Sequence, residues 1–459
     1  MNSTHPVQPN HSPSDWANRL TSLPIALRLL SGLGGLILFG ALLFMLPGIS
    51  NRPLSFTDAL FTSASALTVT GLSVISPGRD LTFMGQLLLL VMIQVGGIGL
   101  MVFTVVIFRL LGRRISLVER IALRNVFGKV MPGAIFHLIF LVMAVVLILE
   151  SAGAVLLWLQ WRPYMEPGSA AWYAIFHSIS AFCNSGFELF TGLPGFDAIP
   201  NDSGTLSILG GLIFIGSLGV PVVADLLALR RKYKLTLQTR LTLLMIVGMM
   251  FASTIVLIIG ESIRPGVLAQ EPWDRRIGIS LFQSISARTA GFTPLEAFEA
   301  ISPPAQLILM LVMFVGASPA SMGGGITTGT AVVLITALWS YARNRPYPEV
   351  GGRTISNETI RRATAVLTIS LIVVFMVTLL LLLTNPGLTL DGALFEVISA
   401  FATCGLTLAY TPRLTIFGQL LIIVVMIWGR LGALSIMVAL TRPTQQPIYY
   451  YPEEQIMIG

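Results

Sequence analysis

Long apolar stretches alternate with shorter, half-polar segments along most of the chain. A helix needs about 20 apolar residues to cross a bilayer, and eight stretches reach that length. They are residues 23–47, 83–111, 136–160, 205–229, 241–262, 305–340, 363–384 and 415–440. Within each successive pair of stretches lies a segment of only about a dozen residues, which is too short to cross. The pattern predicts an all-α membrane protein with eight transmembrane helices and four short pore helices.

The four short segments share one sequence pattern, which identifies them as internal repeats. They read ALFTSASALTVTG at 59–71, AIFHSISAFCNSG at 174–186, SLFQSISARTAG at 280–291 and ALFEVISAFATCG at 393–405. Each has a Ser-Ala pair four residues after its Phe and then a Gly, with one residue fewer between Ser and Gly in the third segment. The repeats predict a pseudo-fourfold arrangement around a pore.

These repeats divide the chain into four helix–pore loop–helix units. The units are residues 23–111, 136–229, 241–340 and 363–440. The polar residues 1–22 are expected to form a disordered cytoplasmic N-terminus, and residues 441–459 form a C-terminal tail.

Basic residues gather in the loops 109–137, 230–240 and 341–362, all of which follow an even-numbered stretch. Together with Arg19, Arg28 and Arg442, these loops hold 19 of the 28 Lys and Arg residues. The positive-inside rule places them and both termini in the cytoplasm. The short segments then enter from the opposite side, and the four units are parallel rather than inverted repeats.

Composition excludes several other classes of protein. Hydrophobic residues make up 54% of the chain and charged residues 11%, against about 25% charged residues in soluble proteins. The two cysteines, Cys183 and Cys404, exclude a disulfide framework. The sequence contains no phosphate-binding loop and no dinucleotide-binding glycine motif. We therefore expect no enzyme activity and no cofactor in this chain, so any nucleotide dependence must come from a partner.

A cation filter is the function that best fits the four short segments. The negative C-terminal dipole end of each pore helix favours a cation, and a ring of backbone carbonyls can replace the water shell of K⁺. Glycine suits such a turn because it tolerates positive φ and close backbone approach. The predicted filter residues are Thr68, Val69, Thr70, Gly71, Cys183, Asn184, Ser185, Gly186, Arg288, Thr289, Ala290, Gly291, Ala402, Thr403, Cys404 and Gly405. We expect K⁺ at their carbonyls and no transition-metal site.

A glycine-rich interruption of the sixth stretch predicts a gate below this filter. Proline and three consecutive glycines oppose a helix in mid-span, and irregular backbone at that depth should line a cavity. The predicted gate residues are Gly316, Ala317, Ser318, Pro319, Ala320, Ser321, Met322, Gly323, Gly324, Gly325, Ile326, Thr327, Thr328 and Gly329, with Arg430 from the last stretch. The alternative is a plain connector between two shorter helices.

Three further side chains carry specific expectations. Arg430 is expected to face the cavity and bond the gate loop, with an ion pair to Glu150 as the structural alternative. Arg288 is expected to point behind the filter and brace it against Glu396 or Asp58. The two cysteines are expected to be unpaired at the filter and within reach of external Cd²⁺, the alternative being that both pack behind the filter.

The four segments, the run at residues 286–292 and the glycine-rich interruption resemble the Trk/Ktr/HKT superfamily of cation transporters. A single span before the first pore segment and the tail at 451–459 resemble the Ktr-type membrane subunit. The resemblance implies K⁺ uptake across the inner, cytoplasmic membrane of a bacterium and a homodimer with one pore per subunit. It also implies a cytosolic ring of RCK-type subunits that bind ATP or ADP, and it leaves Na⁺ open as an activator or as a coupling ion in symport.

Two alternatives remain open from the sequence. One is a Na⁺-permeable relative, although all four filters end in Gly, whereas Ser at the first of these positions goes with Na⁺ selectivity in plant relatives. The other is a membrane scaffold that holds an RCK-type sensor without conducting. Growth of a K⁺-uptake-deficient host on low K⁺ separates both from K⁺ uptake.

Overall fold

The computed structural model describes residues 25–99, 132–192, 198–219, 222–223, 225–226, 229, 234–316, 318–319 and 321–432. These residues confirm the predicted all-α class. Their only sheet is a two-stranded antiparallel hairpin of β1 (Glu349–Val350) and β2 (Arg353–Thr354). The predicted N-terminal segment, the C-terminal tail, residues 109–131 of the loop 109–137 and residues 230–233 of the loop 230–240 lie outside the described residues.

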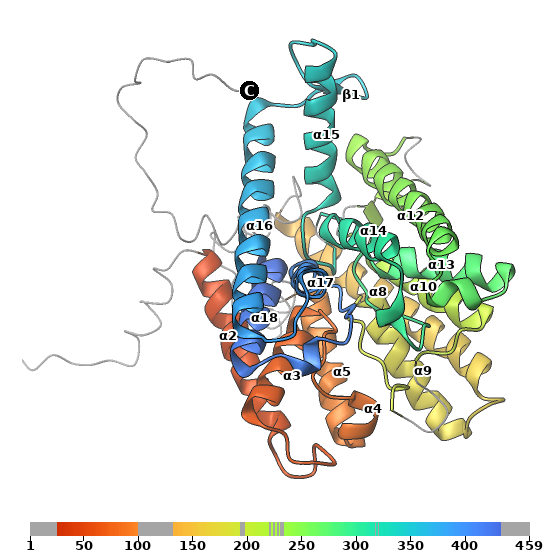
Figure 1. Cartoon of the computed structure of the whole chain (residues 1–459). Helices are drawn as coiled ribbons and strands as arrows, with labels where there is room; N and C mark the ends of the chain where they lie inside the picture. The colour runs from red at the N-terminus through yellow and green to blue at the C-terminus, as the bar shows by residue number, and fades with distance from the viewer. Residues whose placement is uncertain are drawn as a thin grey trace, which may run out of the picture.

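The main helices follow one another in four groups of similar make-up (Figure 1). The first group is α2 (Ile25–Phe44), α3 (Phe56–Thr68) and α5 (Phe83–Ile98), and the second is α8 (Pro132–Trp161), α9 (Pro167–Phe182) and α10 (Ser203–Gly216). The third is α12 (Leu237–Ile263), α13 (Trp273–Ser286), α14 (Pro303–Phe314) and α15 (Thr328–Ala342), and the fourth is α16 (Asn357–Thr384), α17 (Leu390–Ala402) and α18 (Ile416–Leu431). Four short elements join them: α4 (Pro77–Asp80), η1 (Val267–Gln270), η2 (Phe298–Ala300) and η3 (Thr411–Arg413).

Most of these helices begin at residues suited to that position. A Ser, Thr or Asp side chain at the N-cap accepts a hydrogen bond from an amide of the first turn, which has no partner within the helix. The caps are Ser55, Thr82, Asp202, Thr236, Thr327, Ser356, Thr389 and Thr415. Helices α9 and α14 instead begin with Pro167 and Pro303, which fits the first turn because proline lacks an N–H.

The four groups close into a ring. In the first, second and fourth groups the short helix packs on the helices before and after it, as α3 does on α2 and α5, and in the third group α13 packs on α12. Between groups, α5 packs on α9, α10 on α13, α14 on α17, and α18 returns to α3. The helix that follows the short helix in each group therefore contacts the short helix of the next group. This sequential packing brings the C-terminal ends of α3, α9, α13 and α17 toward one place.

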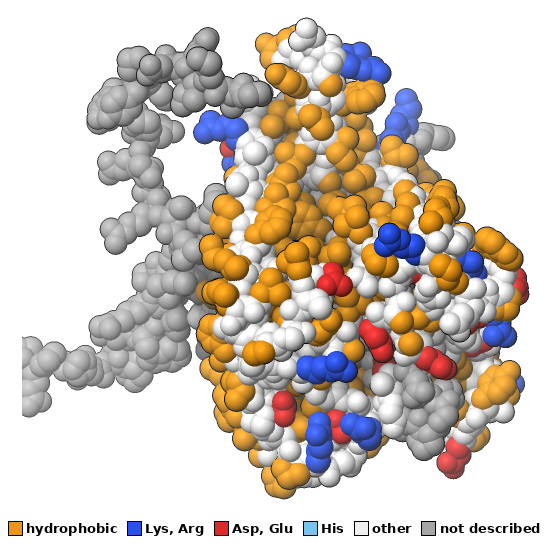
Figure 2. All heavy atoms as spheres, in the orientation of Figure 1, with side chains coloured by type: hydrophobic (Ala, Val, Ile, Leu, Met, Phe, Trp, Pro, Cys, Tyr) orange, Lys and Arg blue, Asp and Glu red, His pale blue; other side chains and the backbone are white. Residues whose placement is uncertain are grey.

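Among the residues that the structure describes, fewer helices are long enough to cross a membrane than the sequence predicts. Among the described residues three qualify by length and composition, namely Met143–Trp161, Leu237–Ile263 and Asn357–Thr384, while six apolar helices are shorter. Hydrophobic side chains cover a broad area over α15 and α16, and charged side chains gather nearer the loops (Figure 2). An all-α membrane protein is supported, and the number of spans stays a prediction.

The interruption predicted for the stretch 305–340 is present. Helix α14 ends at Phe314 and α15 begins at Thr328, so Thr328 and Gly329, predicted to belong to the loop, are helical instead. Yet this stretch is not alone, because α5, α10 and α18 end at Ile98, Gly216 and Leu431, inside stretches predicted to continue. Restricting the break to the third unit was wrong.

Candidate functional site

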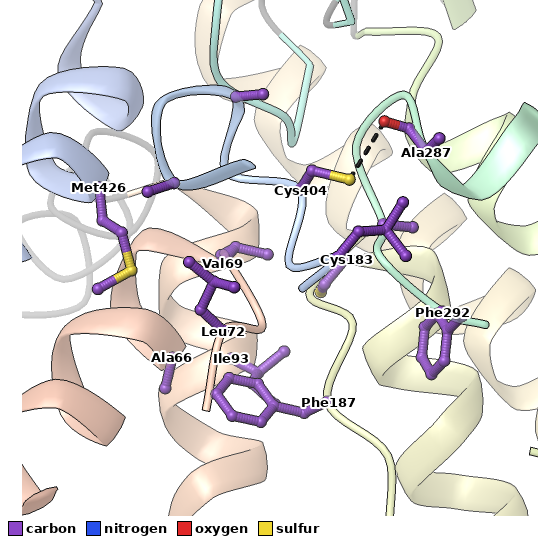
Figure 3. Close-up of a cluster of buried hydrophobic side chains, with 14 of the residues drawn as sticks. Ala66, Val69, Leu72, Ile93, Cys183, Phe187, Ala287, Phe292, Cys404 and Met426 are labelled. Carbon is purple, nitrogen blue, oxygen red and sulfur yellow. Dashed lines mark hydrogen bonds between the residues drawn. The ribbon is translucent and has the colours of Figure 1, made fainter. Parts of the chain in front are cut away.

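The segments that follow the short helices lie close to one another, as the labelled residues Val69, Cys183, Ala287 and Cys404 show (Figure 3). A Cβ atom added to Gly71 would overlap the carbonyl oxygen of Ser185, far inside the 3.0 Å that real Cβ contacts respect. The same overlap recurs around the ring, for Gly186 with Ala290, for Gly291 with Cys404 and for Gly405 with Thr70. Each carbonyl that precedes one Gly thus lies against the Gly of the preceding repeat. The ring closes in sequence order.

Glycine is required at these positions for backbone geometry as well as space. The φ angles are +85° at Gly71, +72° at Gly186, +73° at Gly291 and +98° at Gly405. Residues with a Cβ rarely adopt such angles. The repeated Gly of the sequence therefore marks a repeated backbone conformation.

Hydrogen bonds to the repeated Ser explain how each short helix turns into the ring. The carbonyl of Ser65 accepts the N–H of Thr70 (2.8 Å), and those of Ser180 and Ser399 accept the N–H five residues later, both at 2.9 Å. In the third repeat, which is one residue shorter, Ser286 accepts from both Ala290 and Gly291.

Three of the four Ser hydroxyls add a second bond, whereas the buried Ser65 hydroxyl has no hydrogen-bond partner among the described residues. Ser180 and Ser286 each donate, at 2.6 Å, to the carbonyl of the Phe after the Gly, which is Phe187 or Phe292. In the fourth repeat the Ser399 hydroxyl instead accepts the N–H of Gly405. In the second, third and fourth repeats the Ser therefore stabilises the turn with its hydroxyl as well as its carbonyl.

A second set of four glycines supports the ring and was missed in the sequence. A Cβ added to Gly96, Gly216, Gly316 or Gly429 would overlap the carbonyl of the residue two after the repeated Ser. Those carbonyls belong to Leu67, Phe182, Arg288 and Phe401. The signal was readable as GGIG at 96–99, GSLG at 216–219, GASP at 316–319 and GRLG at 429–432. These motifs let each second helix approach the end of its short helix closely, and the helix stops there.

The glycine-rich loop of the third repeat lies against the fourth filter segment. The Gly324 N–H donates to the Thr403 hydroxyl at 2.8 Å, and a Cβ added to Gly325 would lie 3.2 Å from Ala402. The loop also bonds back to its own helix, because the Ile326 N–H donates to the Phe314 carbonyl. The predicted gate residues Ala317 and Ala320 lie outside the described residues.

Arg430 bonds this loop directly. Its guanidinium donates to the carbonyls of Met322 and Gly96, and so joins the loop to the first repeat. No ion pair links Arg430 to Glu150 among the described side chains. Glu150 instead accepts a hydrogen bond from Gln94 at 2.9 Å. The expected contact with the loop is present, and the alternative partner was wrong.

Arg288 points behind the ring, but its expected partners were wrong. The side chain is only 1% exposed, and it donates to the carbonyl of Gly316 from Nε (3.3 Å) and Nη2 (3.2 Å). The Glu396 carboxylate instead accepts hydrogen bonds from the hydroxyls of Thr407 and Thr411 and from the Leu408 N–H. Carbonyls at a helix end lack intrahelical donors, so the backbone just after α14 offers Arg288 an acceptor.

Both cysteines are free, as expected, but neither thiol is accessible. The Cys183 sulfur lies beside Gly97, 3.4 Å from Oε1 of Gln94. The Cys404 sulfur lies 3.1 Å from the Ala287 carbonyl (Figure 3). This burial favours the alternative in which both cysteines pack behind the filter.

External Cd²⁺ is therefore expected to leave ion flux through the parent chain unchanged, because a thiol with no exposed surface cannot bind it. The matched control is Ser73→Cys, which places a thiol at a half-buried residue just beyond Gly71. Flux through this variant should fall on addition of Cd²⁺. Inhibition of the parent that disappears in Cys183→Ser or Cys404→Ser would contradict the assigned packing.

Comparison with known proteins decides the family. Residues 39–448 match the family model for TrkH, described as a cation transport protein. The chain belongs to this TrkH cation transport family. The superfamily resemblance seen in the sequence is confirmed, and the chain is a member of a family of transporters rather than enzymes.

Relatives of this TrkH-family chain match it over nearly their whole length. It is 35% identical to "Ktr system potassium uptake protein B" of Vibrio alginolyticus, covering 93% of both chains. It is 31% identical to "Potassium/sodium uptake protein NtpJ" of Enterococcus hirae, covering 92% of this chain and 95% of that one. The fold is shared with the potassium transporter TrkH from Vibrio parahaemolyticus, at a TM-score of 0.70 and 23% identity, over 91% of this chain and 84% of that one.

Proposed function

We propose that the chain takes up K⁺ across the cytoplasmic membrane of a bacterium through a pore enclosed by its four repeats. The closed ring of four glycines and their neighbouring carbonyls carries this proposal. The printed names of the two relatives, both uptake proteins for potassium or for potassium and sodium, support the choice of ion.

The proposed pore uses eight membrane spans and four pore helices, α3, α9, α13 and α17. Their C-terminal dipole ends favour a cation at the ring. The second helices stop beside the pore-helix ends, so irregular backbone there would line a water-filled cavity below the filter. The basic loop at 341–362 and both termini would face the cytoplasm.

Selectivity would come from the backbone of residues 68–71, 183–186, 288–291 and 402–405. Carbonyl oxygens replace the hydration shell of K⁺. The buried Arg288 guanidinium donates to the Gly316 carbonyl, so the proposal assigns this side chain a supporting role and not that of an ion ligand. The cysteine side chains likewise contribute packing and not ligands.

Closure would come from the loop between α14 and α15, held beneath the fourth filter segment by Thr403 and Arg430. We propose that a cytosolic RCK-type ring carrying ATP or ADP moves this loop, and that two copies of the chain form a homodimer with one pore each. The word "system" in the name of the Vibrio alginolyticus relative supports a separate regulatory component. Na⁺ enters the proposal as an activator or a coupling ion, which uptake with and without Na⁺ would test.

Thr403→Val is expected to raise K⁺ flux about two- to tenfold, since it removes one buried hydrogen bond that holds the loop at Gly324. The measurement is initial K⁺ uptake without the cytosolic partner, normalised to inserted protein. Thr289→Val is the matched control, because the Thr289 hydroxyl has no hydrogen-bond partner. An equal rise in both variants, or a rise in neither, would show that the Thr403 bond does not hold the loop closed.

Growth of a bacterial host that lacks its own K⁺ uptake tests the proposed function. Expression of this chain with an RCK-type partner should restore growth at low external K⁺. Insertion without restored growth would favour the non-conducting scaffold. Uptake of Na⁺ as fast as K⁺ would favour a Na⁺-permeable relative, an alternative that the name of the Enterococcus hirae protein keeps in view.

A further inference from the structure

The residue after the repeated Phe is polar in all four short helices. It is Thr62, His177, Gln283 or Glu396, and each is at most 1% exposed. A buried polar side chain needs a hydrogen-bond partner to avoid a desolvation cost. The four residues occupy one position of the repeat, yet the structure gives them different partners.

Glu396 binds the extended residues that follow the fourth filter segment. Its carboxylate accepts the Leu408 N–H at 3.0 Å, and it also accepts hydrogen bonds from the hydroxyls of Thr407 and Thr411. Leu408 lies three residues after Gly405. Three hydrogen bonds converge on this one carboxyl group, so Glu396 holds the outer end of this segment at several points.

His177 binds the matching point of the second repeat. Its Nε2 accepts the N–H of Leu189, three residues after Gly186, at 3.2 Å. The neighbour of Nδ1 is the backbone carbonyl of Tyr173, 2.7 Å away. Because a carbonyl can only accept, Nδ1 carries the proton and donates it in this bond. Rings of Trp161 and Phe190 pack on the imidazole, with centroids 5.4 and 4.8 Å away. The ring is thus fixed as a neutral acceptor.

The other two repeats lack this tether. In the third, the residue three after the Gly is Pro294, which has no N–H to donate, and both polar atoms of the Gln283 amide are buried without a partner. In the first, the Thr62 hydroxyl donates to the backbone carbonyl of Asp58, in its own helix, at 2.8 Å. The tethered second and fourth segments lie opposite each other, because the ring closes in sequence order.

We infer that Glu396 and His177 are positioning residues that hold the outer ends of the fourth and second filter segments, and so set ion selectivity along one diagonal of the ring. The inference rests on the proposed K⁺ filter. The carbonyls of a tethered segment cannot move inward to bind a smaller ion, because the residues that follow its Gly are bonded to the pore helix behind it. The first and third segments have no such bond at this position.

The test is the ratio of K⁺ to Na⁺ uptake in the same K⁺-uptake-deficient cells, which does not depend on how much protein has inserted. Glu396→Leu should lower the ratio about five- to tenfold, and His177→Phe, which keeps a ring but loses the acceptor, about threefold. Glu396→Gln keeps an acceptor oxygen for the Leu408 N–H and should stay within about twofold of the parent. Gln283→Leu is the matched control and should leave the ratio unchanged, since its amide has no partner to lose.

Two results would overturn the inference. One is a parent-like ratio in both Glu396→Leu and His177→Phe. The other is a loss of selectivity in Gln283→Leu as large as in Glu396→Leu, which would show a general packing effect at this helix position. A parent chain that takes up neither ion would instead contradict the proposed function itself, whereas a K⁺-selective parent with unchanged variants contradicts the tethers alone.

Discussion

Deletion of residues 318–325 is expected to raise K⁺ flux about tenfold or more and to weaken its dependence on a cytosolic partner. The deletion removes the Gly324 N–H bonded to Thr403 and the Met322 carbonyl bonded to Arg430. Two buried bonds, each worth about 1 kcal/mol, correspond to roughly tenfold or more in the closed population. Initial K⁺ uptake with and without the partner measures both effects.

Arg430→Gln supplies a second route to the same result. It removes a charged donor from the Met322 and Gly96 carbonyls while leaving the loop intact, and it should raise flux in the same direction. A loop deletion that inserts normally, conducts no faster and keeps its partner dependence would identify the loop as a connector. The gate would then lie elsewhere.

Gly71→Ser is expected to lower the preference for K⁺ over Na⁺ by at least about tenfold. The added Cβ would overlap the Ser185 carbonyl, and the backbone φ of +85° disfavours any side chain. The Ser185 carbonyl must therefore move, which breaks the ring at its contact between the first and second repeats. Uptake of the two ions under matched gradients measures the change.

Gly48→Ser is the matched control for backbone strain. Gly48 has a φ of +86° but open space around an added Cβ, so this variant carries a conformational cost of the same kind, of order 1–3 kcal/mol, away from the ring. Its ion preference should equal that of the parent. A preference unchanged in Gly71→Ser, or equally reduced in both variants, would contradict the role of Gly71 in the ring.

The short helices and their turns could be predicted because the same residues recur at the same positions in all four repeats. Phe61 and its counterparts, the Ser-Ala pair and the final Gly recur with little change, and the positive φ of Gly71 accounts for that Gly. The third repeat is one residue shorter, and its Ser286 carbonyl bonds both Ala290 and Gly291. The loop after Phe314 was also visible, because proline and a run of glycines oppose a helix.

The breaks in the other second helices could not be found from apolar runs alone. Gly96 and Gly429 sit in continuous hydrophobic sequence, so hydropathy does not mark the point where the helix stops. Only comparison of the four repeats against one another isolates the glycine that faces the Leu67 or Phe401 carbonyl. The comparison of the short segments needed to be extended to the helices that follow them.

The partners of the two buried arginines were beyond sequence reasoning for a different reason. Acidic side chains such as Glu150 and Glu396 are few and easily proposed, but a guanidinium can equally bond a backbone carbonyl, which every residue has. Arg288 and Arg430 both do so. The direction of the cysteine side chains likewise depends on how the backbone turns after each helix, which residue identity does not fix.

The location of a bound ion tests the central claim most directly. Crystals of the full chain grown with Rb⁺ in place of K⁺ would show the ion by its anomalous scattering. We expect density on the ring axis at the level of the Thr70, Ser185, Ala290 and Cys404 carbonyls, where the four repeats meet. A well-ordered ring without ion density, with Rb⁺ bound elsewhere in the chain, would contradict the assignment of these segments as the filter.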